Sequence, residues 1–475
     1  MSSIIQQSIK ASIWSTFSEL LAKLISPLVF LLLTRILTPE DYGIVAVATT
    51  ILGFVYVITD LGANSVIIQY RNNDLDDILN VAFWMNLIIG GVLCVVVFIL
   101  ADYIANILGQ DKAGIVIRVM AIQIIPYSLC SVQTTIKKKY LDFKTLFYIR
   151  IVTVGVPAIV SIPIALLGGG YWAIIWGSVT GSFFSAIVLW MKSEWRPALS
   201  FKHSQFKYLF SKSLWDSIEQ LSIWIPMGLD TYLITKYLSV VDLGLYTTSR
   251  SLFSTISGLI FAPIIPVMFS TFSKLQKERS PSLNKILMYS QTIITASIAF
   301  VCTFVFIYRD VIAGLIFTNK WDGIAPIIGI IFLIMGFKYT NALLQEVVRA
   351  DGRFKELSIN SAIVVIIEIP ILFIAVNYGI IPYVIARCCS LYLYFPYTLY
   401  LVKRSFNISP IQIVYNLRYE FIISIILILT SLFVEQFHTL IRYSIDTLIY
   451  MLFMAVYIYY RRKDLNMLLG SLRKK

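Results

Sequence analysis

The sequence has few charged residues and almost no histidine. Charged residues make up 14% of its 475 positions and histidine occurs only twice, whereas hydrophobic residues make up 58%. A soluble domain is about 25% charged, so the composition excludes that class. No G-x-x-x-x-G-K-[ST] loop is present, which excludes nucleotide hydrolysis by that route. The five cysteines show no C-x-x-C spacing, so we expect them to pack within helices rather than form disulfides or bind a metal.

Long apolar runs dominate the rest of the sequence. Tyr42–Thr59, Asn80–Ala101 and Ile286–Tyr308 contain no charged residue, and a helix crosses a bilayer in roughly 20 residues. Continuous runs predict helices rather than the alternating strands of a barrel. With weaker segments included, we expect an all-α integral membrane protein of about 14 transmembrane helices. The expected spans are 13–36, 43–65, 79–101, 114–135, 148–167, 171–191, 212–236, 246–270, 285–307, 323–345, 358–376, 380–402, 417–436 and 444–461.

The chain also repeats itself, at an offset of 201 residues. Thr34, Arg35, Leu37, Thr38, Asp41 and Gly43 recur as Thr235, Lys236, Leu238, Ser239, Asp242 and Gly244. The repeat predicts two six-helix lobes, residues 1–200 and 201–410, followed by 411–475 with the last two helices and a basic tail. A duplicated membrane unit is typical of secondary transporters, whose substrate site lies between the copies near the bilayer midplane.

The repeated motif itself predicts a helix start in each copy. Thr38 and Ser239 are hydroxyl residues that an acidic residue follows three positions later, namely Asp41 and Asp242. This spacing is that of a helix N-cap, and Pro39 suits the first helical position of the first copy. We therefore interpret the motif as architectural.

Basic residues indicate the orientation. With the amino terminus placed in the cytoplasm, most of the 39 Lys and Arg residues fall in inward segments, as the positive-inside rule requires. We expect both termini in the cytoplasm and basic loops such as 192–212 beside anionic lipid head groups. The net charge of +13 is dispersed over many loops, which argues against a nucleic-acid partner. The first apolar segment is long and more such segments follow, so no cleaved signal peptide is expected.

Ionisable residues within the spans are the candidates for a substrate site. Each costs at least about 2.5 kcal/mol at the bilayer centre unless it is paired with an opposite charge or hydrated. Glu19 and Lys23 lie one helical turn apart; they either pair in a packing seam or line an aqueous cavity where Lys23 meets an anionic substrate. The candidates for the cavity are Glu19, Lys23, Asp60, Asp216, Glu219, Asp230, Arg250 and Lys338.

Two further ionisable residues are expected to form a pair. Glu368 precedes the outer end of its predicted helix. Arg387 follows the outer start of the next predicted helix by about the same number of residues. Equal depth on neighbouring helices predicts contact. The pair is either a structural ion pair or a proton- or sodium-sensitive switch.

Several motifs together resemble a known family. They are Trp14, the segment from Thr34 to Gly43, and Asp60-Leu61-Gly62 followed by Ile68-Gln69. These resemble the polysaccharide transporters of the MOP superfamily, the Wzx-type lipid-linked oligosaccharide flippases. Phe317-Thr318-Asn319-Lys320-Trp321 is similar to the F-x-x-K-W of the subgroup that includes the colanic acid exporter.

The resemblance implies two lobes that face each other in a V around a central cationic cavity. It implies a bacterial cytoplasmic-membrane protein that flips undecaprenyl-diphosphate-linked oligosaccharides by alternating access for surface polysaccharide biosynthesis. It also implies coupling to H+ or Na+, no other cofactor, no catalytic residue, and a lipid-tail groove at the last two helices. A polysaccharide polymerase and chain-length machinery are the protein partners it suggests.

Two other classes stay open. A MATE-like multidrug extruder takes organic cations and needs an acidic cavity, which Asp216, Glu219 and Asp230 could supply. An integral-membrane polysaccharide polymerase or glycosyltransferase is the enzyme alternative, but its expected large outward loop is missing from the sequence. The flippase interpretation is the one we favour.

Overall fold

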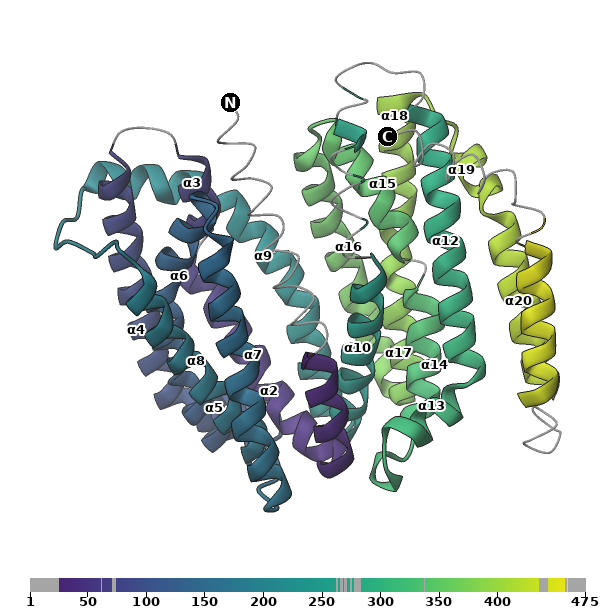
Figure 1. Ribbon diagram of the computed structural model, residues 1–475, viewed down its shortest axis with the longest axis horizontal. Coiled ribbons are helices and arrows are strands. Elements are labelled where there is room, and N and C mark those ends of the chain that lie inside the picture. The colour runs from purple at the N-terminus through teal and green to yellow at the C-terminus, as the bar shows by residue number, and fades with distance from the viewer. Residues whose placement is uncertain are drawn as a thin grey trace. The chain divides into compact units, whose positions relative to one another are not determined.

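The structure is a computed structural model. It describes residues 25–60, 62–70, 74–261, 283–336, 338–434 and 443–457, with short pieces at 264, 268, 271–273, 276 and 459; the side chains at 215, 216, 219, 354 and 432 lie outside this description. Every element within these ranges is a helix, as Figure 1 shows. The expected all-α membrane fold is therefore confirmed.

The helices group into two compact units. Unit 1 comprises Met1–Thr248 and Ile316–Trp321, and unit 2 comprises Ser249–Leu315 and Asp322–Lys475. The division of the chain at residues 200 and 410 stays a prediction.

Unit 1 begins, within the described residues, with an apolar helix at Ile25–Ile36. It continues with α2 (Pro39–Asp60), α3 (Ala63–Gln69), α4 (Leu75–Ile107), α5 (Ala113–Ala121), α6 (Ile124–Lys139), α7 (Phe143–Leu166), α8 (Trp172–Lys192), α9 (His203–Tyr237) and the first part of α10 (Val240–Phe261). The short helix η1 (Asn319–Trp321) also belongs to this unit.

Unit 2 holds the rest of α10 and the later helices. These are α12 (Leu283–Ile307), α13 (Arg309–Ile316), α14 (Ile324–Met335), α15 (Lys338–Ala350), α16 (Phe354–Ala375), η2 (Val376–Tyr378), α17 (Ile380–Ser390), η3 (Leu391–Tyr394), α18 (Phe395–Phe406), α19 (Pro410–Asn416) and α20 (Arg418–Val434). A last apolar helix runs over Tyr443–Tyr457.

Each expected span coincides with one to three consecutive helices, within the described residues. Eight described helices are long and apolar enough to cross a membrane, or nine if the bent pair Pro410–Asn416 and Arg418–Ser431 is one span. The count of about 14 stays a prediction, since residues 1–24 lie outside the description. The sequence analysis did not predict α3, α13 or α19 as separate helices.

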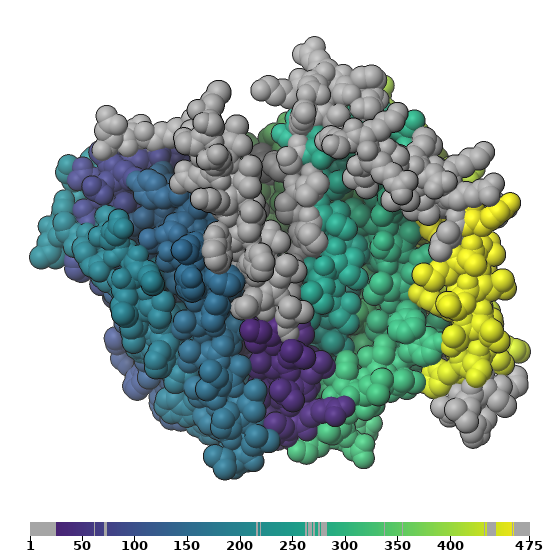
Figure 2. All heavy atoms as spheres, viewed as in Figure 1, coloured from purple at the N-terminus to yellow at the C-terminus, as the bar shows by residue number. Residues whose placement is uncertain are grey.

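Large apolar side chains remain exposed along the spans. Ile99 of α4 is 68% exposed, Ile159 of α7 is 72% exposed, and Leu448 of the last helix is 71% exposed. Figure 2 shows this last helix as a yellow strip along the edge of unit 2. Apolar exposure on this scale is foreign to soluble monomers, and it is what lipid-facing helices require. The protein is thus a multi-pass membrane protein.

Small residues set the helix packing in unit 1. A methyl group at Gly177 of α8 would lie 2.0 Å from Ser161 Oγ of α7, and one at Gly181 would lie 2.5 Å from Pro157 Cγ. Without a hydrophobic driving force between helices in lipid, close approach through small residues provides the contact.

The basic end of α6 leads directly into α7. Asp142 caps α7 by accepting a hydrogen bond from Thr145 N at 3.1 Å, and it also pairs with Lys137 Nζ at 3.0 Å. Burial raises the pKa of Asp142, but the hydrogen bonds from Lys137 and Thr145 outweigh it, so the pKa falls below its usual range. The capping explains why α7 starts at Phe143.

Candidate functional site

Three basic side chains come close together in unit 2. Arg250 comes from α10, Lys338 is the first residue of α15, and Arg387 lies in α17. Arg250 and Arg387 are close enough to Lys338 for their charges to repel its ammonium group. We call Arg250, Lys338 and Arg387 the cationic cluster. Lys338 and Arg250 were expected to line a substrate site, and the structure brings them together with Arg387.

Arg387 pairs with a carboxylate in this region. Its Nη1 donates to Glu368 Oε1 of α16, and Ser390 Oγ donates to the same oxygen. Glu368 is 2% exposed and Arg387 is 8% exposed. The contact expected from equal depth is present, while the role of the pair in ion coupling stays a prediction. Glu368 thus places a carboxylate beside the cationic cluster.

Two aromatic rings pack against Lys338 of the cluster. Lys338 lies within the apolar span Ile324–Ala350. Its Nζ lies 5.1 Å from the ring centroid of Phe253 and 5.2 Å from that of Tyr339. The aromatic faces stabilise the ammonium group.

Unit 1 holds a polar cluster of a different kind. Asp60 Oδ1 accepts hydrogen bonds from Asn64 Nδ2 at 2.6 Å and from Ser131 Oγ at 3.0 Å. Asn86 Nδ2 donates to Ser131 Oγ at 3.2 Å, and Thr135 Oγ1 donates to Asn64 Oδ1. We call these five residues the Asp60 cluster. Of them, the sequence analysis named only Asp60.

The remaining acidic candidates have other surroundings or lie outside the described residues. Asp230 of α9 is 2% exposed and accepts a hydrogen bond from Tyr246 Oη at 2.8 Å, as a packing residue does. The helix α9 also carries Asp216 and Glu219, whose side chains are not described. Glu19 and Lys23 lie outside the described residues, so their expected role stays a prediction.

The repeated motif forms the predicted helix starts. Thr38 N and Oγ1 both donate to Asp41 Oδ2 at 2.8 Å, and α2 begins at Pro39. In the second copy, Ser239 Oγ donates to Asp242 Oδ2 at 2.6 Å and α10 begins at Val240. Both are N-terminal caps of the expected type, so the prediction is confirmed.

The motif glycines also bring the two copies into contact. A methyl group at Gly43 would lie 2.0 Å from Val240 O, and one at Gly244 would lie 1.8 Å from Pro39 O. Pro39 and Val240 occupy equivalent positions of the repeat, as Gly43 and Gly244 do. The contact between α2 and the start of α10 is therefore reciprocal, and it requires glycine at both positions.

The F-x-x-K-W segment caps the end of the first helix. Trp321 Nε1 donates to Thr34 O at 2.8 Å and to Leu37 O at 3.2 Å. Lys320 Nζ donates to Ile36 O at 3.0 Å. The last carbonyl groups of a helix have no partner within it, and this segment supplies the donors.

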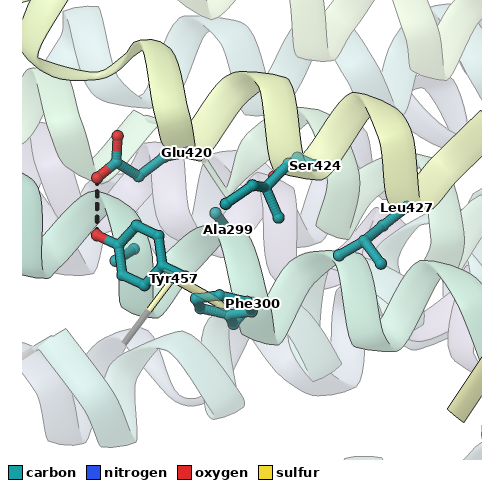
Figure 3. A pocket seen from close by; sticks show the side chains of 8 residues that line it. Ala299, Phe300, Glu420, Ser424, Leu427 and Tyr457 are labelled. Carbon is teal, nitrogen blue, oxygen red and sulfur yellow. Dashed lines mark hydrogen bonds between the residues drawn. The ribbon is translucent and has the colours of Figure 1, made fainter. Parts of the chain in front are cut away.

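A buried carboxylate near the carboxyl-terminal end was missed by the sequence analysis. Glu420 of α20 is 2% exposed and its Oε1 accepts a hydrogen bond from Tyr457 Oη at 2.7 Å (Figure 3). Both residues line a cavity of about 10 Å³ with Ala299, Phe300, Ser424 and Leu427. That volume is about the size of one water molecule, so the cavity is too small for a substrate. An acidic residue within the expected span 417–436 was the available signal.

Comparison with known proteins decides the family. The family described as polysaccharide biosynthesis protein matches residues 32–326. The chain belongs to this family. The succinoglycan biosynthesis transport protein ExoT of Rhizobium meliloti (strain 1021) is 24% identical over 310 residues, which cover 64% of this chain and 61% of ExoT. The lipopolysaccharide biosynthesis protein WzxC of Escherichia coli (strain K12) is 20% identical over 366 residues, 74% of this chain and 73% of WzxC.

Solved structures agree on the fold. The lipid II flippase MurJ in an inward closed conformation aligns with a TM-score of 0.72 at 18% identity, over 95% of this chain and 99% of MurJ. An inward-facing multidrug MATE transporter of the MOP superfamily aligns at 0.65 and 16% identity, over 82% of this chain and 96% of the transporter. These structures show the fold, and the family match confirms the expected resemblance to polysaccharide transporters.

Proposed function

We propose that this member of the polysaccharide biosynthesis family flips lipid-linked oligosaccharides across the bacterial cytoplasmic membrane by alternating access. The substrate would be an oligosaccharide repeat unit on undecaprenyl diphosphate, destined for a surface polysaccharide. The protein makes and breaks no covalent bond in this account; its relatives include a transport protein, ExoT.

The cationic cluster is the observation that carries the proposal. Arg250, Lys338 and Arg387 lie within the spans of unit 2, and Lys338 forms no ion pair with a described residue. Cations in a membrane interior are costly unless a partner of opposite charge compensates them. A diphosphate provides that charge, and arginine and lysine are the side chains that bind phosphate through charge-assisted hydrogen bonds.

The same cluster argues against the drug extruder. The fold resembles a multidrug MATE transporter, but organic cations require an acidic site. Asp230, one of the acids that could supply it, is buried against Tyr246. We therefore keep an anionic substrate as the proposal.

The orientation of the chain, its energy coupling and its protein partners complete the proposal. We place both termini in the cytoplasm on the distribution of the basic residues. Inward or outward transport of a charged lipid needs a driving force, for which we propose a proton or sodium gradient. A polymerase and chain-length machinery would act on the exported repeat unit.

Lys338→Met tests this function in cells. We expect complete lipid-linked repeat units to accumulate on the cytoplasmic face, because the variant keeps the length of the side chain and removes its charge. A charge-assisted hydrogen bond contributes about 1.5–3 kcal/mol, so export should fall about ten-fold or more. Accumulated glycolipid is measured by extraction and mass spectrometry.

Lys285→Met is the matched control. Lys285 also lies over an aromatic ring, that of Tyr289 at 5.9 Å, but it is exposed at the start of α12. Export should stay normal in this variant. Normal export in Lys338→Met at equal expression would remove the cationic cluster from the site, and raised dye sensitivity with normal surface glycan would favour the drug extruder.

A further inference from the structure

Three pairs of polar side chains follow one another along the seam that α6 forms with α2 and α3. Each pair takes one residue from α6 and one from α2 or α3, and each lies four positions after the pair before it. The pairs are Tyr56 with Tyr127, Asp60 with Ser131, and Asn64 with Thr135. We call these six residues the polar strip. Residues four apart lie on the same face of a helix, so the strip is continuous along α6.

Tyr56 and Tyr127 form the first pair of the strip. Their rings stack with centroids 4.1 Å apart and an interplanar angle of 24°, an arrangement that restricts the motion of both side chains. Neither hydroxyl forms a hydrogen bond with a described residue, and both hydroxyl oxygens are accessible. The pair therefore presents two fixed hydroxyl groups to whatever occupies the space beside them.

This pair lies deep in the membrane. Tyr127 precedes Lys139, the last residue of α6, by twelve positions, which is about 18 Å along a helix. The basic end Lys137–Lys139 belongs at a membrane surface, and half of the hydrocarbon core is about 15 Å thick. The polar strip thus extends from near that surface to about the middle of the bilayer.

The polar strip does not suit a surface that faces lipid. Tyr56, Asp60, Asn64 and Tyr127 are all partly exposed. Lipid tails offer no hydrogen-bond partner to such groups, and ionisable residues within membrane spans face the bundle interior or a water-filled cavity. The partly exposed side of the strip therefore meets water or a polar ligand.

The chemistry of the strip matches a carbohydrate. The hydroxyl groups of Tyr, Ser and Thr both donate and accept hydrogen bonds, and so does the amide of Asn. Sugar hydroxyl groups do the same, and each ring of an oligosaccharide brings several of them. Successive pairs lie about 6 Å apart along the helix, a spacing that lets neighbouring rings meet neighbouring pairs. An organic cation would instead leave the two tyrosine hydroxyls unused.

We propose that the polar strip of unit 1 binds the sugar rings of the transported glycolipid. The hydroxyls of Tyr56 and Tyr127 would exchange hydrogen bonds with ring hydroxyls at the deep end of the strip. This assignment rests on the proposed function and adds a second determinant to it. The cationic cluster of unit 2 recognises the diphosphate, which all such substrates share, whereas the polar strip recognises the glycan.

The double variant Tyr56→Phe/Tyr127→Phe tests the strip. It keeps both rings and removes only two hydroxyls that have no hydrogen-bond partner among the described residues, so the midpoint of unfolding should stay that of the wild type. Binding to the full chain in detergent is measured by calorimetry with two probes. One is the lipid-linked repeat unit extracted from cells that lack this protein, and the other is undecaprenyl diphosphate without sugar.

The wild type should bind the sugar-bearing probe more tightly than the bare one. The double variant should lose about ten-fold or more in affinity for the sugar-bearing probe, the effect of two lost hydrogen bonds. Its affinity for undecaprenyl diphosphate should not change. Lys338→Met should weaken the binding of both probes, because both carry the diphosphate. Should the double variant fail to fold, Tyr56→Phe alone should show about a three-fold loss for the sugar-bearing probe only.

Tyr103→Phe is the matched control. Tyr103 of α4 is 67% exposed, lies outside the polar strip, and its hydroxyl also has no hydrogen-bond partner in the described part of the chain. Both affinities should equal those of the wild type in this variant.

Three results would overturn the assignment and leave the proposed function intact. They are equal affinity of the wild type for both probes, an unchanged affinity of the double variant for the sugar-bearing probe, and an equal loss for both probes. A wild type that binds neither probe would contradict the proposed function and this assignment with it.

Discussion

Each unit holds a polar cluster among its helices, and the two clusters differ in charge. In unit 1, the carboxylate of Asp60 lies among amide and hydroxyl groups at the carboxyl-terminal end of α2. In unit 2, the ammonium group of Lys338 lies near the guanidinium groups of Arg250 and Arg387. The charge of the cationic cluster is opposite to that of the ligand we propose there.

The difference follows from the charge of the side chains. A charged group in a membrane interior is costly unless a group of opposite charge compensates it. A charged cluster among membrane helices therefore marks a candidate site, and its sign indicates whether a charged ligand is an anion or a cation.

The largest effect on stability should come from splitting the ion pair of unit 2. Glu368→Leu leaves Arg387 buried without this carboxylate, and breaking a buried pair costs about 3–5 kcal/mol. We expect a strongly lowered midpoint of unfolding in detergent. The double variant Glu368→Leu/Arg387→Met should recover much of this loss, because it removes both charges.

The double variant also distinguishes a structural role of Arg387 from a role in transport. If Arg387 contributes to substrate binding, export should stay impaired although stability returns. Normal export in the stable double variant would assign Arg387 a structural role only.

A smaller effect is expected where packing rather than charge holds unit 1 together. Gly43→Ala places a methyl group 2.0 Å from Val240 O, so α2 and α10 must separate. Overpacking costs about 1–3 kcal/mol, which thermal unfolding should detect. Gly91→Ala, whose methyl group meets open space in α4, is the control and should lose no stability; an equal loss in both variants would contradict the close contact.

The smallest effect concerns the F-x-x-K-W segment. Trp321→Phe keeps an aromatic ring beside Tyr42, whose ring centroid lies 5.3 Å from that of Trp321, but removes the donor to Thr34 O and Leu37 O. The loss should be about 1 kcal/mol, measured as a small decrease in the midpoint of unfolding. A decrease as large as that of Glu368→Leu would mean that Trp321 does more than cap a helix.

Much of the fold was predictable because the amino-acid composition of a segment indicates whether it spans a membrane. Hydropathy located the helices, and the repeat supported the charged span 212–236, which coincides with part of α9. Spacing in the motif predicted the caps at Thr38 and Ser239, and equal depth predicted the contact between Glu368 and Arg387.

The Asp60 cluster was not predictable in the same way. Asn64, Asn86, Ser131 and Thr135 are uncharged polar residues of a kind that occurs throughout these spans, and they come from three separate helices. Only tertiary packing brings them together. The turn at Gly62 was also missed, because hydropathy continues across it.

Flipping in proteoliposomes tests the central claim most directly. Purified protein is reconstituted with a fluorescent diphosphate-linked oligosaccharide, and its transfer between leaflets is followed by quenching from outside. The account predicts fast transfer with the wild type and with Lys285→Met, and transfer slowed about ten-fold or more with Lys338→Met. Equal transfer in vesicles with and without the protein, or equal transfer by the wild type and Lys338→Met, would contradict it.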